Sequence, residues 1–389
     1  MQGENWLEDE LAERRAGNLE RRLTVWPATG GRITVDGRTL LNLSNNDYLG
    51  LARHPRVVES AVKALHEYGA GATASRLVAG TLPLHEELER RLAEFKGYPA
   101  ALVFGSGYLT NAGTIPALVG PDDLVLADRL AHASLLDAAV LSRARLLRFR
   151  HNDATHLDEL LSGHPARRRL VLTESVFSMD GDLAPLPDLA AVTAKHEAML
   201  LVDEAHATGV FGPGGAGLIS GHGLADRIAI SMGTLSKALG GYGGFVACGE
   251  SLRAWLINKA RAFIYTTAPP PAVLGAALGA LMVLSKRPEM GHELLARAAG
   301  FRDALKAAGL DTLNSASQIV PVQVGDNAKA LSLSRRLKED GILAVAIRPP
   351  TVPPGTARLR FSVSLAHEPA DLEEAARKII AAARAEGLA

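Results

Sequence analysis

The residues with the clearest chemical potential follow two short apolar runs in the middle of the chain. Asp203 and His206 come directly after the run at 199–202, and Lys237 follows the run at 228–230. A carboxylate at the end of a buried strand is costly unless it has a cationic or hydrogen-bonding partner. An acid, an imidazole and an amine at neighbouring strand ends could together hold and activate one organic cofactor.

Pyridoxal phosphate is a cofactor whose requirements this set meets. It needs a lysine for a Schiff base, an acid that keeps its pyridine nitrogen protonated, and donors for its phosphate. Lys237 can supply the amine, Asp203 the acid, and His206 can reach the phenolic oxygen. Thr234 and Ser236 offer phosphate donors. Taken singly, Asp203 could be a cap and His206 a core histidine, but the ordered set favours the cofactor.

Two further segments follow apolar runs. Gly105–Tyr108 comes after the run at 101–104 and precedes a helical stretch, so its main-chain N–H groups could cradle a phosphate. The same pattern could also be only a tight turn. His132 follows the run at 124–127, where its imidazole could stack on a cofactor ring. A polar surface histidine is the alternative.

The elements that must position these residues are short apolar runs alternating with helical stretches from about residue 50 to 270. Several runs lack period-two alternation, which is typical of strands covered on both faces in a mostly parallel α/β sheet. Such sheets place ligands beyond the carboxyl ends of their strands. The predicted strands are 101–104, 124–127, 146–149, 170–173, 199–202, 228–231 and 244–247.

Helical and extended segments flank this region on both sides. We predict an exposed helix at 4–22, followed by a hairpin with an Asp36-Gly37 turn. After Pro269–Pro271 the pattern indicates a long helical region to about 310. It then reads strand 319–324, helix 328–340, strands 342–347 and 357–364, and a helix from Pro369. The predicted division is 1–49, an N-terminal helix and ribbon; 50–285, a large cofactor-binding domain; and 286–389, a small α/β domain.

Composition excludes several other classes of function. The 42 basic and 42 acidic residues balance, which gives no general electrostatic basis for binding nucleic acid or an anionic membrane. The single cysteine, Cys248, cannot form an intramolecular disulfide and is expected to be a packed thiol. The apolar stretch 272–284 is too short to span a bilayer and predicts a buried helix. We expect a cytoplasmic protein.

Motifs for other chemistries are missing or incomplete. The sequence has no phosphate-binding P-loop and no nucleophilic serine elbow. His151, Asn152, Asp153 and His156 match no standard metal-ligand spacing, so we expect solvated loop residues and no metal.

Four segments carry a resemblance to a known family, the α-oxoamine synthases. They are 43–50 (LSNNDYLG), 173–182 (TESVFSMDGD), 202–209 (VDEAHATG) and 233–240 (GTLSKALG). The resemblance covers nearly the whole chain. It implies the fold type I of pyridoxal-phosphate transferases, with a large domain built on a mostly parallel seven-stranded sheet and a smaller C-terminal domain. It also implies a homodimer whose active sites lie at the subunit interface.

A C-terminal segment indicates which enzyme of this family the chain resembles. Residues 346–353 (AIRPPTVP), with 324–327 and 355–360, resemble the form found in enzymes of biotin synthesis. These condense L-alanine with a pimeloyl thioester, pimeloyl-CoA or pimeloyl-ACP, to give 8-amino-7-oxononanoate, carbon dioxide and the free thiol carrier. The alternatives are a glycine C-acetyltransferase or another α-oxoamine synthase, a non-catalytic subunit on this fold, and a simple aminotransferase.

The resemblance also implies roles for individual residues. Lys237 would form the Schiff base, Asp203 would pair with the pyridine nitrogen and His206 with the phenolic oxygen, while His132 would stack on the cofactor and touch the substrate. The other implied cofactor contacts are Gly107, Tyr108, Ser178, Thr234 and Thr267, the last toward the phosphate held by the partner subunit.

Besides His132, four residues are implied substrate contacts. Arg360 would grip the amino-acid carboxylate, which suits the planar guanidinium fork. Asn46, Thr351 and Arg21 complete the set, although the neighbouring Arg22 could take the place of Arg21.

Overall fold

The computed structural model describes residues 5–27, 30–35 and 37–388. The chain divides into two compact units. The large unit comprises 46–178 and 182–295, and the small unit comprises 1–45, 179–181 and 296–389. The domain ranges drawn from the sequence stay a prediction.

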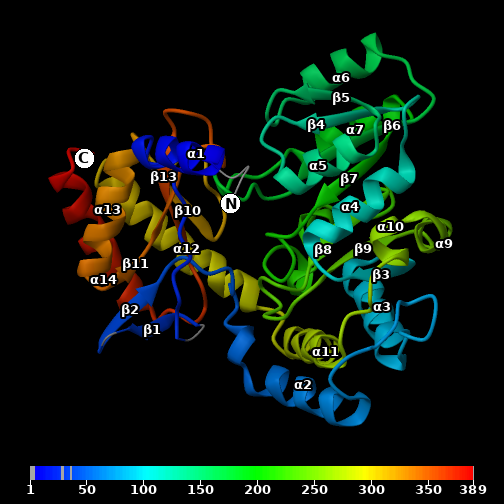
Figure 1. The fold of residues 1–389 in the computed structure, drawn as a ribbon, viewed down its shortest axis with the longest axis horizontal. Helices are drawn as coiled ribbons and strands as arrows, with labels where there is room; N and C mark the ends of the chain where they lie inside the picture. The colour runs from blue at the N-terminus through cyan, green and yellow to red at the C-terminus, as the bar shows by residue number, and fades with distance from the viewer. Residues whose placement is uncertain (1–4, 28–29, 36, 389) are drawn as a thin grey trace. The chain divides into compact units, whose positions relative to one another are not determined.

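The large unit is built on one sheet of seven strands (Figure 1). Their order in the sheet is β3-β9-β8-β7-β6-β4-β5, and β9 is antiparallel to both neighbours while the remaining pairs are parallel. The predicted mostly parallel α/β sheet is thus confirmed. The strands are β3 (Ala100–Phe104), β4 (Leu124–Asp128), β5 (Arg145–Phe149), β6 (Arg169–Glu174), β7 (Met199–Asp203), β8 (Ile230–Thr234) and β9 (Gly244–Cys248).

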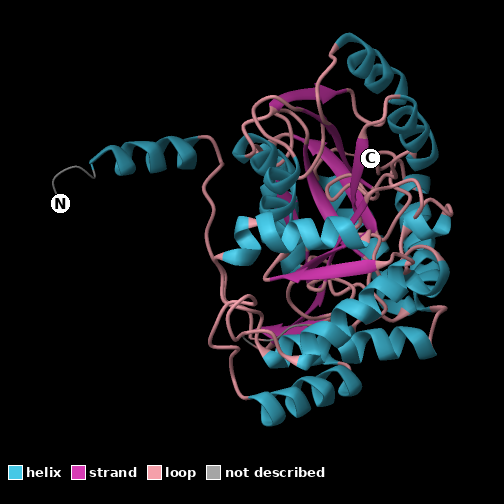
Figure 2. Ribbon diagram, turned by 90° about the vertical axis from the view of Figure 1, so that its right-hand side faces the viewer, coloured by secondary structure: helices cyan, strands magenta, loops and turns pink. Residues whose placement is uncertain are grey.

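Helices pack alongside these strands (Figure 2). The predicted buried helix at 272–284 is confirmed as α11, which starts with Pro271 at its first turn. The helices of this unit are η1 (Leu51–Arg53), α2 (Pro55–Tyr68), α3 (Pro83–Lys96), α4 (Gly107–Leu118), α5 (Ala133–Leu141), α6 (Ala154–Gly163), α7 (Leu186–Lys195), η2 (Pro213–Gly215), α8 (Leu218–Gly221), α9 (Glu250–Lys259), α10 (Arg261–Ile264) and α11 (Pro271–Lys286). The next helix, α12 (Met290–Ala307), begins in the large unit and continues into the small unit.

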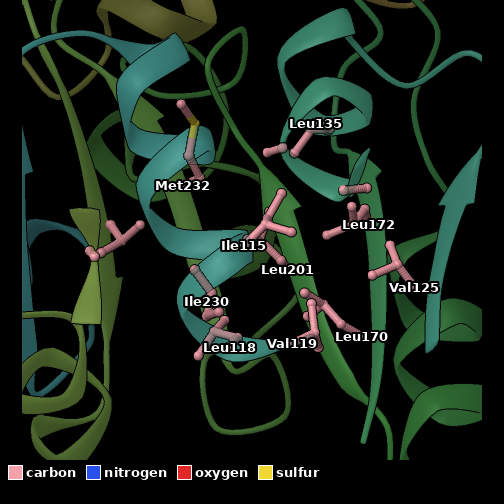
Figure 3. Close-up of a cluster of buried hydrophobic side chains, with 14 of the residues drawn as sticks. Ile115, Leu118, Val119, Val125, Leu135, Leu170, Leu172, Leu201, Ile230 and Met232 are labelled. Carbon is pink, nitrogen blue, oxygen red and sulfur yellow. The ribbon is translucent and has the colours of Figure 1, made fainter. Parts of the chain in front are cut away.

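The core of the large unit fixes α4 and α5 against the sheet (Figure 3). Ile115 and Leu118 of α4 and Leu135 of α5 pack in one cluster with apolar side chains of the strands. Burying one such side chain stabilises the fold by about 1.5–3 kcal/mol. The labelled strand side chains in the close-up are Val125, Leu170, Leu172, Leu201, Ile230 and Met232. This packing fixes the positions of the N-termini of α4 and α5 relative to the strands.

Cys248 belongs to the same core cluster and is fully buried. Burial raises the pKa of its thiol to about 12. The prediction of a packed thiol is confirmed.

Strand register brings the predicted site residues to one edge of the sheet. Phe104 of β3 and Thr234 of β8 both pair with Gly244 of β9, so the loops that follow them start side by side. Glu174 of β6 pairs with Asp203 of β7 in the same way. The segments after β3, β6, β7 and β8 therefore leave from neighbouring points, as parallel strands require.

The small unit contains two three-stranded sheets, ordered β1-β2-β11 and β10-β13-β12. The predicted strand 342–347 is two strands, and each belongs to a different sheet. The predicted hairpin is confirmed as antiparallel β1 and β2, with Asp36 outside the described residues. The elements are α1 (Asn5–Ala16), β1 (Arg32–Val35), β2 (Arg38–Asn42), β10 (Ile319–Gly325), α13 (Asn327–Glu339), β11 (Ile342–Leu343), β12 (Val345–Ile347), β13 (Ala357–Ser362) and α14 (Pro369–Ala385).

The N-terminal helix ends earlier than the sequence predicts. It stops at Ala16 because Asn18 takes a left-handed conformation (φ 55°). The N–H groups of Gly17 and Leu19 then turn back to carbonyls of the last helical turn. Arg21 and Arg22 therefore lie beyond the helix, in an irregular segment. Among the described residues, no helix combines the length and apolarity that crossing a membrane requires.

Candidate active site

Lys237 lies against a buried histidine. It follows β8 by three residues, and its Nζ is 2.8 Å from Nε2 of His206. Nδ1 of His206 is 2.6 Å from the hydroxyl of the fully buried Tyr48, which also donates to Oδ1 of Asn46 at 3.1 Å. The imidazole is thus held between a phenol and an amine, and its orientation is fixed.

Asp203 ends β7 and is buried. Oδ1 accepts the main-chain N–H of Ala205 at 2.9 Å, and Oδ2 accepts Nδ2 of Asn111 at 3.2 Å. These donors hold the carboxylate in a fixed orientation. Asp203 and Lys237 both act electrostatically on the carboxyl of Glu174, so the acid and the amine share one neighbourhood.

A small polar cradle lies at the start of α4. Ser106 caps the helix by accepting the N–H of Leu109, and a helix N-terminus leaves main-chain N–H groups available to an anion. A Cβ added at Gly107 would lie 3.8 Å from Oγ1 of Thr234, so the helix start and the end of β8 are adjacent. Oγ1 of Thr234 is also 2.7 Å from Oγ of Ser236.

Close approach of the backbone explains a glycine in this cradle. A Cβ at Gly244 would come within 2.8 Å of the Gly107 nitrogen and 2.4 Å of Oγ1 of Thr110. Only glycine lets β9 pass so near the helix start. Tyr108 is exposed, and its hydroxyl donates to Asp137 of α5 at 2.8 Å.

His132 caps the N-terminus of α5. Its Nδ1 is 2.8 Å from Oγ of Ser134 and accepts the Ser134 N–H at 3.2 Å. Its own main-chain N–H donates to Oε1 of the buried Glu174 at 2.7 Å. Ser134 in turn accepts Nδ2 of Asn111 at 2.9 Å, the amide that also holds Asp203. His132 is therefore connected to Asp203 through two side chains.

Ser178 and Thr267 also belong to the large unit. Ser178 is buried, close after the end of β6. Thr267 is exposed and forms an isolated antiparallel bridge with Ser75. Its predicted contact with a partner subunit stays a prediction.

The remaining predicted substrate residues lie in the small unit. Arg21 donates from Nη2 to Oγ1 of Thr351 at 3.1 Å, whereas Arg22 pairs with Glu20 at 2.8 Å. Arg360 is buried in β13 and donates to Oγ of Ser362 at 2.8 Å. Of the two adjacent arginines, Arg21 is the one that meets another predicted substrate residue.

The sequence suggested that His151 is a solvated loop residue, and the structure shows that it is not. Its ring bridges two carboxylates, with Nδ1 2.9 Å from Asp128 and Nε2 2.7 Å from Asp182. Burial alone would lower the pKa of His151, but the hydrogen bonds to both carboxylates outweigh it and raise the pKa to about 10. The chain reverses at Asn152, whose N–H donates to Asp128. A non-local ion bridge of this kind leaves no sign in local spacing.

Three residues of the cluster were not singled out from the sequence: Tyr48, Asn111 and Glu174. Tyr48 and Glu174 lie inside quoted motifs, but their roles depend on contacts across the fold. Asn111 lies four residues after Gly107, on the same face of α4. That spacing from the glycine loop was the available signal.

The cluster fits pyridoxal phosphate on its donor set. It combines an amine beside an imidazole, an oriented carboxylate, and a hydroxyl-lined helix start with close-packed glycines. These are the groups required by the cofactor's aldehyde, ring and phosphate.

Comparisons with known proteins agree with this fit. Residues 38–379 match the family model described as aminotransferase class I and II. The chain is 51% identical over 370 residues to 8-amino-7-oxononanoate synthase of Geobacter sulfurreducens, covering 94% of this chain and 95% of the relative. Serine palmitoyltransferase from S. paucimobilis, solved with a bound PLP–myriocin aldimine, superposes with a TM-score of 0.93 at 33% identity, covering 99% and 98% of the two chains.

A second solved structure extends the comparison. 8-Amino-7-oxononanoate synthase from Francisella tularensis superposes with a TM-score of 0.78 at 30% identity, covering 90% of this chain and 99% of that one. The predicted fold, the pyridoxal phosphate cofactor and the enzyme class are thus confirmed. The chain belongs to the class I and II aminotransferase family, among the acyl-transferring, pyridoxal-phosphate-dependent α-oxoamine synthases that include 8-amino-7-oxononanoate synthase.

Proposed function

We propose that the protein condenses L-alanine with a pimeloyl thioester, carried by CoA or an acyl-carrier protein, in biotin synthesis. The products are 8-amino-7-oxononanoate, carbon dioxide from the alanine carboxylate, and the free thiol carrier. The observation that carries the catalytic part is the contact of Lys237 with His206, in a cluster that includes an oriented Asp203. The choice of substrates is supported by the relative at 51% identity.

The chain's own groups divide the chemistry between them. When bound, pyridoxal phosphate supplies an aldehyde that captures an amine and a ring that stores the electron pair of the substrate α-carbon. Lys237 would hold the cofactor, and its free amine would remove the α-proton of alanine as general base. Asp203 would keep the ring nitrogen protonated, and His206 would hold the phenolic oxygen.

Further groups bind the cofactor and orient the reacting atoms. His132 would stack on the ring and could donate a hydrogen bond to the oxyanion that develops on the thioester carbonyl. Arg360 binds the alanine carboxylate, with Asn46 as a second contact. The phosphate contacts are Gly107, Tyr108, Thr234 and, from the partner subunit, Thr267, while Ser178 is a further cofactor contact.

Two arginines of the small unit support an acyl donor that ends in a carboxylate. Arg348 donates to the main-chain carbonyls of Asn18 and Glu20, which anchors the segment that bears Arg21. Burial, and then the charge of Arg21, lower the pKa of Arg348, so the two guanidinium groups lie near each other. In the described part of the chain, neither forms a salt bridge with an acidic side chain. A pimeloyl chain would supply the missing anion.

We extend the proposal to assembly and location. The protein acts as a homodimer whose partner subunits complete each other's active sites, and it works in the cytoplasm. Size-exclusion chromatography with light scattering tests the dimer.

One assay decides among the candidate reactions. The purified enzyme is incubated with L-alanine and pimeloyl-CoA, and the release of carbon dioxide and free thiol is followed. Pimeloyl-ACP replaces the CoA ester in a second arm, and glycine with acetyl-CoA forms a third. We expect turnover with a pimeloyl donor at least tenfold above the third arm, a difference of about 1.4 kcal/mol. Preference for glycine and acetyl-CoA would identify the alternative reaction, and no thiol release in any arm would refute both.

A further inference from the structure

Glu174 is a buried carboxyl at the cofactor edge to which the proposed reaction gives no role. It ends β6 and pairs in register with Asp203, the last residue of β7. Side chains of register partners in parallel strands point to the same face of the sheet. The two side chains also meet neighbouring helices, since Asp203 bonds to Asn111 of α4 and Glu174 to the first residue before α5. Two carboxyl groups therefore lie together, with little access to water.

The contacts of these residues form a closed ring. Oε1 of Glu174 accepts the His132 N–H at 2.7 Å, and the His132 imidazole meets Ser134 at 2.8 Å. Ser134 accepts one hydrogen bond from Asn111, at 2.9 Å, and Asn111 also reaches Asp203 at 3.2 Å. Pairing between β6 and β7 closes the ring. Glu174 thus holds the main chain of the residue whose imidazole is proposed to stack on the cofactor.

Only one of the two carboxyls can carry a charge at modest cost. Neighbouring carboxylates in a buried site raise each other's proton affinity, and one of them takes a proton. Burial, and then the charge of Asp203, raise the pKa of Glu174 well above its ordinary value. The other charged groups that act on Glu174 are Lys237 and Asp128, of which the lysine opposes the rise. A protonated Glu174 places no negative charge beside Asp203, the residue proposed to pair with the pyridinium.

We propose that Glu174 is a positioning residue that works as a neutral carboxylic acid, holding His132 in its stacking position while leaving Asp203 ionised. The proposal rests on the proposed cofactor site and deepens it. It assigns different protonation states to Glu174 and Asp203, two carboxyls that each end a strand and look equivalent in the sequence.

The Glu174 variants separate charge from hydrogen bonding. Glu174→Gln keeps a neutral group and a carbonyl acceptor for the His132 N–H. Glu174→Leu has a similar volume but no acceptor, which leaves that N–H unsatisfied. We expect Glu174→Leu to lose roughly ten- to a hundredfold in cofactor affinity and to weaken the visible circular dichroism of the bound cofactor. Glu174→Gln should restore the affinity to within about threefold of the parent.

Glu204 provides the matched control. It is as buried as Glu174 and adjoins Asp203, but its carboxylate pairs with Lys96 at 2.5 Å. Infrared difference spectra of the cofactor-free proteins should show a protonated-carboxyl band that Glu174→Gln removes and Glu204→Gln does not. Glu204→Gln should instead lower the melting temperature.

Several results would overturn the inference. These are equal loss of affinity in Glu174→Gln and Glu174→Leu, parental behaviour of Glu174→Leu, or no loss of the infrared band in Glu174→Gln. If Glu174→Leu does not fold, the infrared band and the affinity of Glu174→Gln decide. Failure of the cofactor site itself is distinguishable. In that case the parent would show no visible cofactor band that depends on Lys237. The infrared measurement on the cofactor-free protein would still test Glu174.

Discussion

Tyr48 and His206 are 158 residues apart in the sequence, yet the Tyr48 hydroxyl lies 2.6 Å from Nδ1 of His206. The opposite ring nitrogen faces Lys237 at 2.8 Å. A phenol that precedes the first helix of the large unit therefore sets the orientation of the imidazole at the cofactor lysine. This resembles the way in which one ring nitrogen of a histidine is fixed so that the other can work.

Tyr48→Phe should lower kcat by about fivefold, because it removes a hydrogen bond worth about 1 kcal/mol from the imidazole beside Lys237. The phenyl ring keeps the packing of a fully buried side chain, so the melting temperature should change little. Steady-state kinetics and thermal denaturation check this. Unchanged kcat would show that Tyr48 does not orient His206.

Arg21→Ala should raise the KM for the acyl donor by about tenfold with a smaller effect on kcat, because Arg21 meets Thr351 and not an acidic partner. Its neighbour supplies the control. Arg22 is exposed and pairs with Glu20, so Arg22→Ala should leave both constants near those of the parent. Steady-state kinetics with a pimeloyl donor measure both variants, and a larger KM effect in Arg22→Ala would reverse the assignment.

Glu204→Gln should destabilise the fold by about 3–5 kcal/mol, because it leaves the ammonium of Lys96 buried without its carboxylate. Adding Lys96→Met removes the orphaned charge and should recover much of the loss. The glutamine side chain would still accept the Ile219 N–H that Glu204 now accepts. Denaturant unfolding gives the free energies, and a double variant no more stable than Glu204→Gln would contradict the argument.

His151 should make stability depend on pH. Its pKa is about 10 in the folded state and near 6.5 in the unfolded chain, so the folded protein binds a proton that the unfolded chain lacks between these values. The contribution is full below about pH 6.5 and is lost as pH rises through about 10. Unfolding measured at pH 6, 8 and 10 should show a gap of a few kcal/mol between the parent and His151→Gln at pH 6 that narrows with rising pH. A constant gap would exclude the charged bridge.

Much of the fold follows from local patterns. The seven apolar runs became the seven strands because strands covered on both faces must be continuously apolar, as 199–202 is. The run at 228–231 was displaced by two residues, since Ser231 and Gly233 lack the apolar character that marks a strand. The helix 4–22 was predicted too long because charged residues continue past Gly17, while the turn at Asn18 depends on backbone conformation.

The candidate site was predictable where chemistry follows a strand and not where it depends on distant contacts. Asp203, His206 and Lys237 were visible because each lies just past a buried run. Tyr48 and Glu174 gain their roles from partners across the fold, which no local spacing encodes. The bridge at His151 was missed for the same reason, because Asp128 ends β4 and Asp182 lies in a loop far along the chain.

The central claim is that Lys237 holds pyridoxal phosphate, and the visible spectrum of the purified enzyme tests it most directly. The parent should show the absorbance band of a cofactor bound covalently to lysine, and L-alanine should shift that band. Lys237→Ala should lack the parental band and show no turnover, with an unchanged far-ultraviolet circular dichroism spectrum. A Lys237→Ala protein that keeps both the band and full activity would contradict the account.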